Sequence, residues 1–163
     1  MIEEDEPQPP GMDEYLFKML DMVKAHGVAI QYVMGGAPFG YTVGLTIYKR
    51  HPEIITFGMD PPNTTGILNA LARRVIKDKE VLAHGQVFDD LAEGYSGMLI
   101  AVADEEVDEY LGIAKRLYDV GPRRVTSLQL VFQGPDLLWP WEKGSVYTDT
   151  GYPLLGFPPD TES

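Results

Sequence analysis

The chain has 163 residues, of which 44% are hydrophobic and 23% are charged, a composition that fits one globular domain. Its formal net charge of −12 disfavours general binding to duplex nucleic acid, and the absence of cysteine excludes disulfides, thiolate metal sites and a cysteine nucleophile. The N-terminus is acidic where a signal peptide is basic, and no apolar run reaches the roughly 20 residues that span a bilayer. We therefore expect a soluble, cytoplasmic protein that does not enter a membrane.

The negative charge is concentrated at the N-terminus, where residues 1–15 hold six acidic side chains and no basic one. Residues 1–12 combine this charge with prolines and few apolar side chains, so we expect a disordered acidic arm. A single domain is expected over residues 13–143. The C-terminal tail at 144–163 is rich in proline, glycine and aromatic residues.

Three helices are predicted from apolar residues that recur at helical spacing. The first covers Asp13–His26 and is followed by a glycine, which suits a left-handed residue at a helix end. The second begins with Asn63 as its N-cap and ends near Lys79. The third begins at Asp104 and continues to a Gly-Pro pair at 121–122.

Short β-rich runs lie between these helices, and they are Val28–Met34, Tyr41–Tyr48, Glu53–Met59, Gly97–Ala103 and Val125–Phe132. The first three are separated by too few residues for parallel crossovers, so they predict an antiparallel meander with helices packed against one face. The fold class is therefore α+β, with an antiparallel sheet of about five strands and three helices.

Several short motifs occur in order along the chain, namely Tyr41-Thr42-Val43-Gly44-Leu45, His51-Pro52-Glu53, Phe57-Gly58, Gly94-Tyr95, Tyr110-Leu111-Gly112-Ile113-Ala114, Gln129 and Pro140-Trp141-Glu142. Over residues 27–142 the chain resembles a bacterial and phage family, the domain of unknown function 4262. The resemblance implies an intracellular origin in bacteria or their phages, and it implies no particular activity.

The polar residues show no pattern typical of catalysis. His51 lies before a proline, where it either carries protons or holds the turn by a hydrogen bond, and we favour the structural role. A metal site formed by His84 with Asp89 and Asp90 is disfavoured, because adjacent carboxylates on a strand point to opposite faces. We therefore predict no catalytic residue and no metal site.

A ligand-binding hypothesis rests on the start of the second helix. Asn63, Thr64 and Thr65 would offer hydroxyls and free backbone N–H groups to a phosphate, and Arg73 would add positive charge. The order of hairpin, strand and helix start over residues 28–75 is similar to split barrels that bind flavin mononucleotide (FMN). We expect no cofactor, and FMN is the alternative. The competing interpretation is that these residues only cap the helix.

A second group of polar side chains predicts a pocket within the sheet. Thr42 and Gln129 lie within apolar strands, where a buried polar group needs a partner. We expect both to face inward and to line a pocket together with Tyr41.

Aromatic and aliphatic residues near the C-terminus predict a contact surface. Trp139 and Trp141 flank a proline, so they either close an edge of the core or bind a partner. The tail adds four large apolar side chains, Tyr152, Leu154, Leu155 and Phe157. We expect these four to bury as a strap over the domain or to dock on another protein.

These patterns favour a non-enzymatic regulatory or protein-interaction module, in one version phage-encoded and acting on a host protein. The alternative is a protein that binds a small molecule or FMN through a phosphate site near Asn63. The sequence leaves both functions open.

Overall fold

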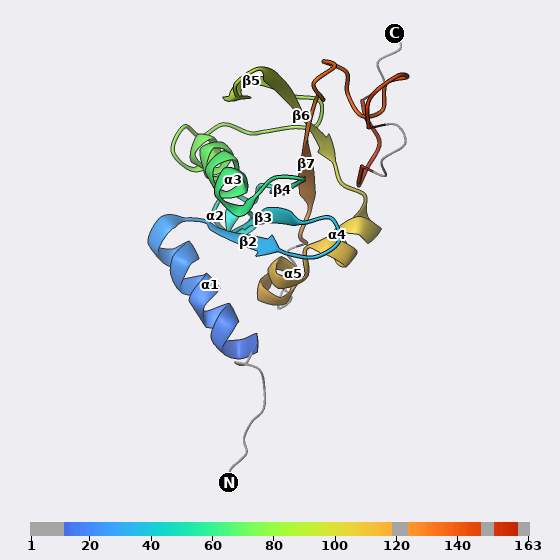
Figure 1. Ribbon diagram of the computed structural model, residues 1–163. Helices are drawn as coiled ribbons and strands as arrows, with labels where there is room; N and C mark the ends of the chain where they lie inside the picture. Colours follow the sequence, from blue (N-terminus) through green and yellow to red (C-terminus); the bar gives the residue numbers. More distant parts are fainter. Residues whose placement is uncertain (1–11, 119–123, 148–151, 160–163) are drawn as a thin grey trace.

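The computed structural model describes residues 12–118, 124–147 and 152–159. Its helices are α1 (Met12–His26), α2 (Leu45–Lys49), α3 (Pro61–Ile76), α4 (Asp104–Tyr110) and α5 (Gly112–Tyr118) (Figure 1). Its strands are β2 (Ala29–Val33), β3 (Phe39–Val43), β4 (Glu53–Phe57), β5 (Val87–Ala92), β6 (Tyr95–Ala101) and β7 (Ser127–Phe132). No helix in the described ranges is long and apolar enough to cross a membrane.

The strands form one six-stranded open sheet in the order β2-β3-β4-β7-β6-β5. The predicted α+β class is confirmed, and so is the antiparallel meander of β2, β3 and β4. The sheet is not wholly antiparallel, because β7 pairs with β4 in parallel after a crossover that contains α3, β5, β6, α4 and α5. It ends at two edge strands, β2 and β5, so the resemblance to a closed split barrel does not hold.

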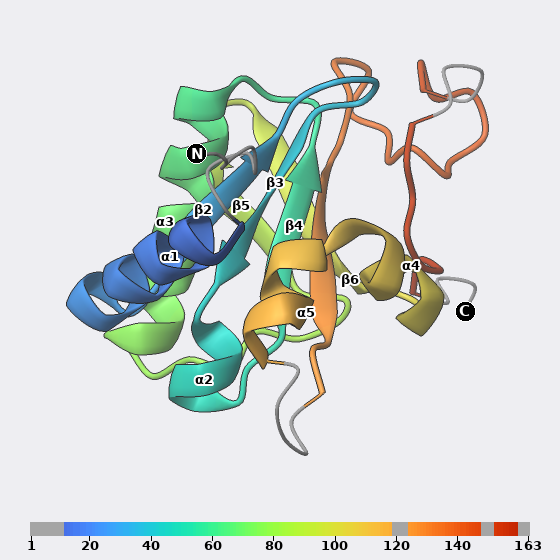
Figure 2. The same ribbon diagram turned by 90° about the horizontal axis from the view of Figure 1, so that it is seen from below.

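Helices cover both faces of the sheet, whereas the sequence predicted helices on one face. Figure 2 shows α1, α4 and α5 on the near face and α3 on the far face. Successive residues of a strand point to opposite faces of the sheet, so each strand contributes side chains to the core on both faces. Ile55 packs in the core beneath α5, and Ile54 packs in the core beneath α3. A strand that is buried on both faces is apolar throughout, and this explains the continuous apolar runs in the sequence.

The two long helices form where the apolar spacing predicts them. Gly27 has a φ of 88°, which confirms the left-handed residue after α1. The start of α3 differs from the prediction, since the N-cap is Asp60 and not Asn63. The Asp60 carboxylate accepts a hydrogen bond of 2.8 Å from the backbone N–H of Asn63.

Three local predictions are wrong. The strand predicted for Tyr41–Tyr48 ends at Val43, because Gly44 (φ 126°) turns the chain into the short helix α2. The third predicted helix is interrupted at Leu111, which separates α4 from α5. Strand β5 was not predicted, since its sequence carries two adjacent aspartates and no clear alternation.

The C-terminal segment covers the part of the sheet that α4 and α5 leave open. In both views, residues 152–159 run beside β6 and β7 (Figures 1 and 2). Met98, Ile100 and Val131 form the buried cluster beneath this segment. The core therefore extends across the whole sheet, but the part of it over β6 and β7 depends on a chain segment without regular secondary structure.

Candidate functional site

A groove of about 540 Å³ lies between α1, the start of β2 and α3. Its lining residues are Met22, His26, Val28, Ala29, Ile30, Thr65, Asn69, Ala72, Arg73, Ile76 and Lys77. We call this hollow the α1–α3 groove. Its volume lies in the range typical of ligand sites, roughly 300 to 1,000 Å³.

Helical periodicity places the polar side chains of α3 along the groove. Thr65, Asn69, Arg73 and Lys77 follow one another at intervals of four residues, so they lie along one side of the helix. Leu68 and its apolar neighbours point into the core instead. The same spacing on α1 brings Met22 and His26 to the opposite wall.

The α1–α3 groove carries positive charge in a protein of net charge −12. Within the described part of the chain, His26, Arg73 and Lys77 form no ion pair or hydrogen bond through their side chains. By contrast, the neighbouring Arg74 bonds Glu80 at 3.2 Å and approaches Asp90 at 3.5 Å. Arg73 and Lys77 therefore keep their charges free for an anionic ligand, and the ring nitrogens of His26 are free beside them.

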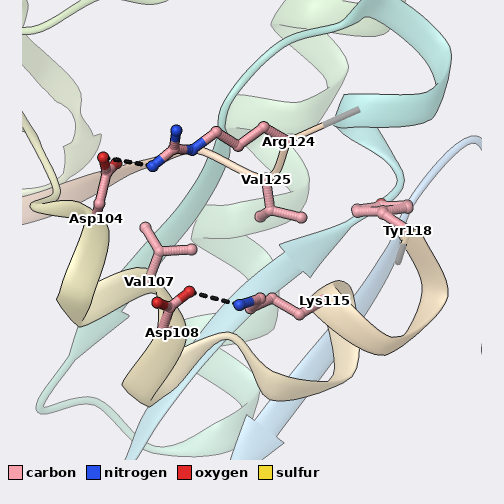
Figure 3. Close-up of a pocket in the computed structure, with 7 residues that line it drawn as sticks. All are labelled: Asp104, Val107, Asp108, Lys115, Tyr118, Arg124 and Val125. Atoms are coloured by element: carbon pink, nitrogen blue, oxygen red, sulfur yellow. Dashed lines mark hydrogen bonds and ion pairs between the residues drawn. The ribbon is translucent and has the colours of Figure 1, made fainter. Parts of the chain in front are cut away.

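A smaller hollow of about 300 Å³ lies between α4, α5 and the residues before β7 (Figure 3). Its charges are already paired, since Lys115 bonds Asp108 and Arg124 bonds Asp104, each at 2.5 Å. Figure 3 shows both ion pairs across the opening, with Tyr118 at the far end. The charges of this hollow are neutralised within the protein, so it is a weaker candidate than the α1–α3 groove.

A third hollow, of about 410 Å³, lies between α3 and β5. It is lined by Asp90 and Glu93, and Asn63 lies on its α3 side. These carboxylates make it unsuitable for the phosphate that the sequence analysis considered.

The most buried charged group of the described residues is Glu53, at the start of β4. Its carboxylate accepts hydrogen bonds from the backbone N–H groups of Gly44, Leu45 and Thr46 at 3.0 to 3.3 Å. It also accepts from the Thr42 hydroxyl at 2.8 Å and from the Tyr118 hydroxyl at 2.9 Å. Glu53 thus caps α2 from another element and ties α5 to the sheet.

The proton positions in this network are determined by its geometry. The Thr42 hydroxyl accepts from the backbone N–H of Ile54, and the Tyr118 hydroxyl accepts from that of Gly44, so both hydroxyl protons point to Glu53. Burial raises the pKa of Glu53, while hydrogen bonds from Thr46, Thr42 and Tyr118 act against that rise. Every group of the network has a partner within the protein, which indicates a structural role.

His51 is buried, and both of its ring nitrogens bond backbone groups, as the preferred structural role requires. Its Nδ1 donates to the carbonyl of Pro52 at 2.8 Å, and its Nε2 accepts from the backbone N–H of Leu82 at 2.9 Å. This pattern requires the neutral imidazole with a proton on Nδ1. Burial lowers the pKa of His51 and favours the same neutral form.

The three polar residues predicted for a phosphate site point in three directions. Asn63 faces the hollow beside β5, and its side chain bonds Asp60. Thr64 is buried and donates to the carbonyl of Met59. Only Thr65 lines the α1–α3 groove, where it lies with the predicted Arg73. The Asp60 carboxylate already occupies the helix end where the phosphate was expected.

Tyr41, Thr42 and Gln129 are all buried, as predicted, but they line none of the three hollows described above. Adjacent residues of a strand face opposite sides, so Tyr41 and Thr42 separate. The Tyr41 hydroxyl accepts from the N–H of Ile113, and burial raises the pKa of this tyrosine to about 12. Gln129 instead holds the C-terminal segment. These three residues therefore have separate partners, and ligand binding by them stays a prediction.

Most residues of the predicted partner surface pack on the protein itself. Trp139 and Trp141 stack with ring centroids 5.6 Å apart, and both rings pack against the β6–β7 cluster with Tyr152 and Leu154. Leu155 is 4% exposed. Phe157 departs from the expected burial, since it is 84% exposed. Partner binding by these six residues stays a prediction.

Backbone hydrogen bonds show how the C-terminal segment is held. The Gln129 side chain donates to the carbonyl of Pro153 at 2.8 Å and accepts from the N–H of Leu155 at 2.9 Å. Ala103 donates to the carbonyl of Leu155 at 2.8 Å. A Cβ atom at Gly156 would lie 1.9 Å from the carbonyl oxygen of Ala101, so only glycine fits this approach. This segment is a strap that packs on its own domain.

Sequence analysis missed His26, Asn69 and Lys77 as members of the α1–α3 groove, and it missed Glu53 as the centre of a polar network. The spacing of Asn69, Arg73 and Lys77 was a usable signal for a polar stripe on α3. His26 had no such signal, because it lies on another helix. Among the described residues, no three histidine or acidic side chains gather as a metal site.

Comparison with known proteins identifies the family and gives no further relative. Searches among curated proteins and among solved structures return no match. The family described as a domain of unknown function (DUF4262) matches residues 22–146. The matched range contains all six strands of the sheet, the Glu53 network and the α1–α3 groove. The chain belongs to the DUF4262 family.

Proposed function

We propose that this protein is a non-enzymatic interaction module that binds a partner protein through the α1–α3 groove. The observation that carries the proposal is the presence of three unpaired basic groups, His26, Arg73 and Lys77, beside an apolar floor in a strongly acidic chain. Charges placed this way attract an acidic partner and set the orientation in which it docks.

An exposed apolar side chain of the groove supports a protein partner. Met22 is exposed on α1 and lines the groove wall. Apolar area of this kind, bordered by charged groups, is a common feature of protein interfaces. Binding is also favoured over catalysis because His51 and Glu53, the buried groups best suited to move protons, are fully engaged in structural hydrogen bonds.

The test compares the wild-type chain with the groove variant Arg73→Glu with Lys77→Glu. A matched control, Arg116→Glu with Lys143→Glu, changes the net charge equally at exposed positions outside the groove. Partners are captured from host extract by chemical cross-linking and identified, and each is then titrated calorimetrically. We expect at least about tenfold weaker binding by the groove variant and wild-type binding by the control. Equal affinity of all three proteins would contradict the proposal.

A small anionic ligand is the second candidate, and the volume of the groove favours it. Thr65 and Asn69 would then bond the ligand, while Arg73 would neutralise its charge. FMN belongs to this class, and flavin absorbance of the purified protein would identify it directly. Calorimetry with inorganic phosphate and with FMN completes the test, and no binding of either removes this candidate.

A further inference from the structure

The outer edge of β2 is an open pairing edge. Strand β2 ends the sheet, and its five residues pair with β3 in continuous register. Among the described residues, no backbone–backbone hydrogen bond outside the β2–β3 ladder involves Ala29–Val33, and the only side chain that bonds this backbone is Gln31, at 3.5 Å from the Tyr32 carbonyl. The strand's sequence, Ala-Ile-Gln-Tyr-Val, contains no charge and no proline. A regular, uncharged edge of this kind is a template for a further strand.

The opposite edge has the features that normally prevent such pairing. The register of β5 shifts between Phe88 and Ala92, and the strand carries Asp89 and Asp90. Bulges and charged side chains are common devices by which proteins block edge strands. The fold thus protects one edge and leaves the other unprotected.

The start of the open edge lies within the α1–α3 groove. Val28, Ala29 and Ile30 line the groove, while α1 packs on one face of the sheet and α3 on the other. The two helices therefore flank the edge as walls, and the strand forms the floor between them (Figure 2). A single extended chain fits such a space, since a strand lies about 4.8 Å from its neighbour.

We infer that the partner binds as an extended acidic segment that adds a strand to the edge of β2. This inference rests on the proposed function and names the kind of partner the groove takes. Backbone hydrogen bonds to β2 would supply affinity, and side chains directed at the two walls would supply specificity.

The basic residues of α3 specify where the acidic side chains belong. Arg73 and Lys77 are one helical turn apart, with Cβ atoms about 6 Å from each other. Side chains on one side of a strand repeat at about 7 Å. Acidic residues at alternate positions of the added segment therefore match both bases, and the intervening residues face α1, where Met22 offers an apolar contact.

A second copy of the chain suits this edge less well than a peptide. Its β2 carries its own α1 and α3, which would collide with the walls of the groove. A two-fold contact would also oppose the same basic groups of both copies, and each copy has a net charge of −12.

The experiment titrates the isotope-labelled full chain with a short peptide of alternating glutamate and valine, observed by NMR. Two control peptides share its length, one with lysine in place of glutamate and one with N-methyl groups on alternate amides. We expect shifts and slowed exchange at the backbone N–H groups of Ala29–Val33, and at least about tenfold weaker binding by either control and by the variant Arg73→Glu with Lys77→Glu.

The outcomes separate this inference from the proposed function. Equal binding of the N-methylated peptide in the groove would overturn strand addition and leave an acidic partner in place. Absence of binding by the glutamate peptide would also overturn the inference, while cross-linked partners sensitive to Arg73 would still support the function. Sedimentation analysis could also show a dimer. If that dimer buries β2, the edge pairs with a second copy of the chain, and the inference is overturned as well.

Discussion

The two edge strands of the sheet, β5 and β2, differ in how well their unpaired backbone groups are protected from pairing with another strand. At β5 a register shift and two aspartates interrupt the edge, and next to it the strap and the stacked tryptophans cover β6 and β7. At β2 the edge is regular and uncharged, and basic side chains surround it. The comparison shows that the C-terminal residues cover the sheet next to β5, whereas the backbone at the edge of β2 can still pair with another strand.

The largest effect is expected from the Glu53 network, which lies between the two edges and joins β3, β4, α2 and α5. Glu53→Gln places an amide N–H₂ against at least two of the donors that now face the carboxylate. The free energy of unfolding should fall by about 3 kcal/mol or more, since each unpaired buried donor costs about 1–3 kcal/mol. Urea denaturation measures this loss. The exposed Glu109→Gln serves as a control, and equal stability of the two variants would show that the network is dispensable.

The strap should matter for stability and not for binding at the groove. Leu155→Ala removes a buried side chain and should lower the free energy of unfolding by about 2–3 kcal/mol, whereas Phe157→Ala at an exposed position should change it by less than about 0.5 kcal/mol. Thermal denaturation compares the two variants. If Leu155→Ala weakens partner binding and leaves the free energy of unfolding unchanged, the strap is part of the interface. The proposed difference between the strap side and the groove side of the sheet would then be wrong.

A smaller effect is expected from the titration of His51, which joins the turn before β4 to Leu82. Because burial lowers its pKa in the folded protein, the neutral form stabilises the fold above the ordinary pKa of about 6.5, and this contribution is lost as the pH falls through the lowered value. His51→Gln should remove this part of the pH dependence. Denaturation between neutral and mildly acidic pH measures it, and the comparison with wild type cancels the opposite contribution of Glu53.

The smallest effect is expected at the protected edge. Asp89→Asn with Asp90→Asn removes the charges of β5 but leaves its register shift, so we expect weak self-association at high concentration. Asp13→Asn with Asp21→Asn removes the same charge from α1 and should leave the protein monomeric. Sedimentation analysis distinguishes the two. Identical behaviour of both variants would mean that charge does not protect this edge.

Local periodicity predicted the elements whose stability depends on their own residues. The long helices α1 and α3 were predictable because apolar residues at helical spacing create one buried face. The helix α2 was not, since Leu45–Lys49 contains β-branched and aromatic residues that favour a strand. Its first N–H groups bond Glu53, so a carboxylate from another element stabilises the helix.

The candidate site shows the same division. Thr65 and Arg73 were predicted from the sequence, because they lie on one helix and their spacing is visible there. His26 comes from α1, and the strand edge comes from β2, so their meeting with Arg73 depends on how α1 and α3 pack on opposite faces. The partners of Tyr41, Thr42 and Gln129 were not predictable, because burial alone does not tell which group satisfies a buried polar side chain.

The sequence by itself determined the class of the fold, the ends of α1, the family and the presence of an apolar C-terminal segment, because periodicity, glycine conformation and motif order are local properties. Only the tertiary structure decided the parallel pairing of β4 with β7 and the identity of the two edges. It also decided that the strap closes on Gln129 and that three basic groups meet beside β2. These features depend on contacts between residues far apart in the chain, whose free energy comes from packing and burial that no local pattern records.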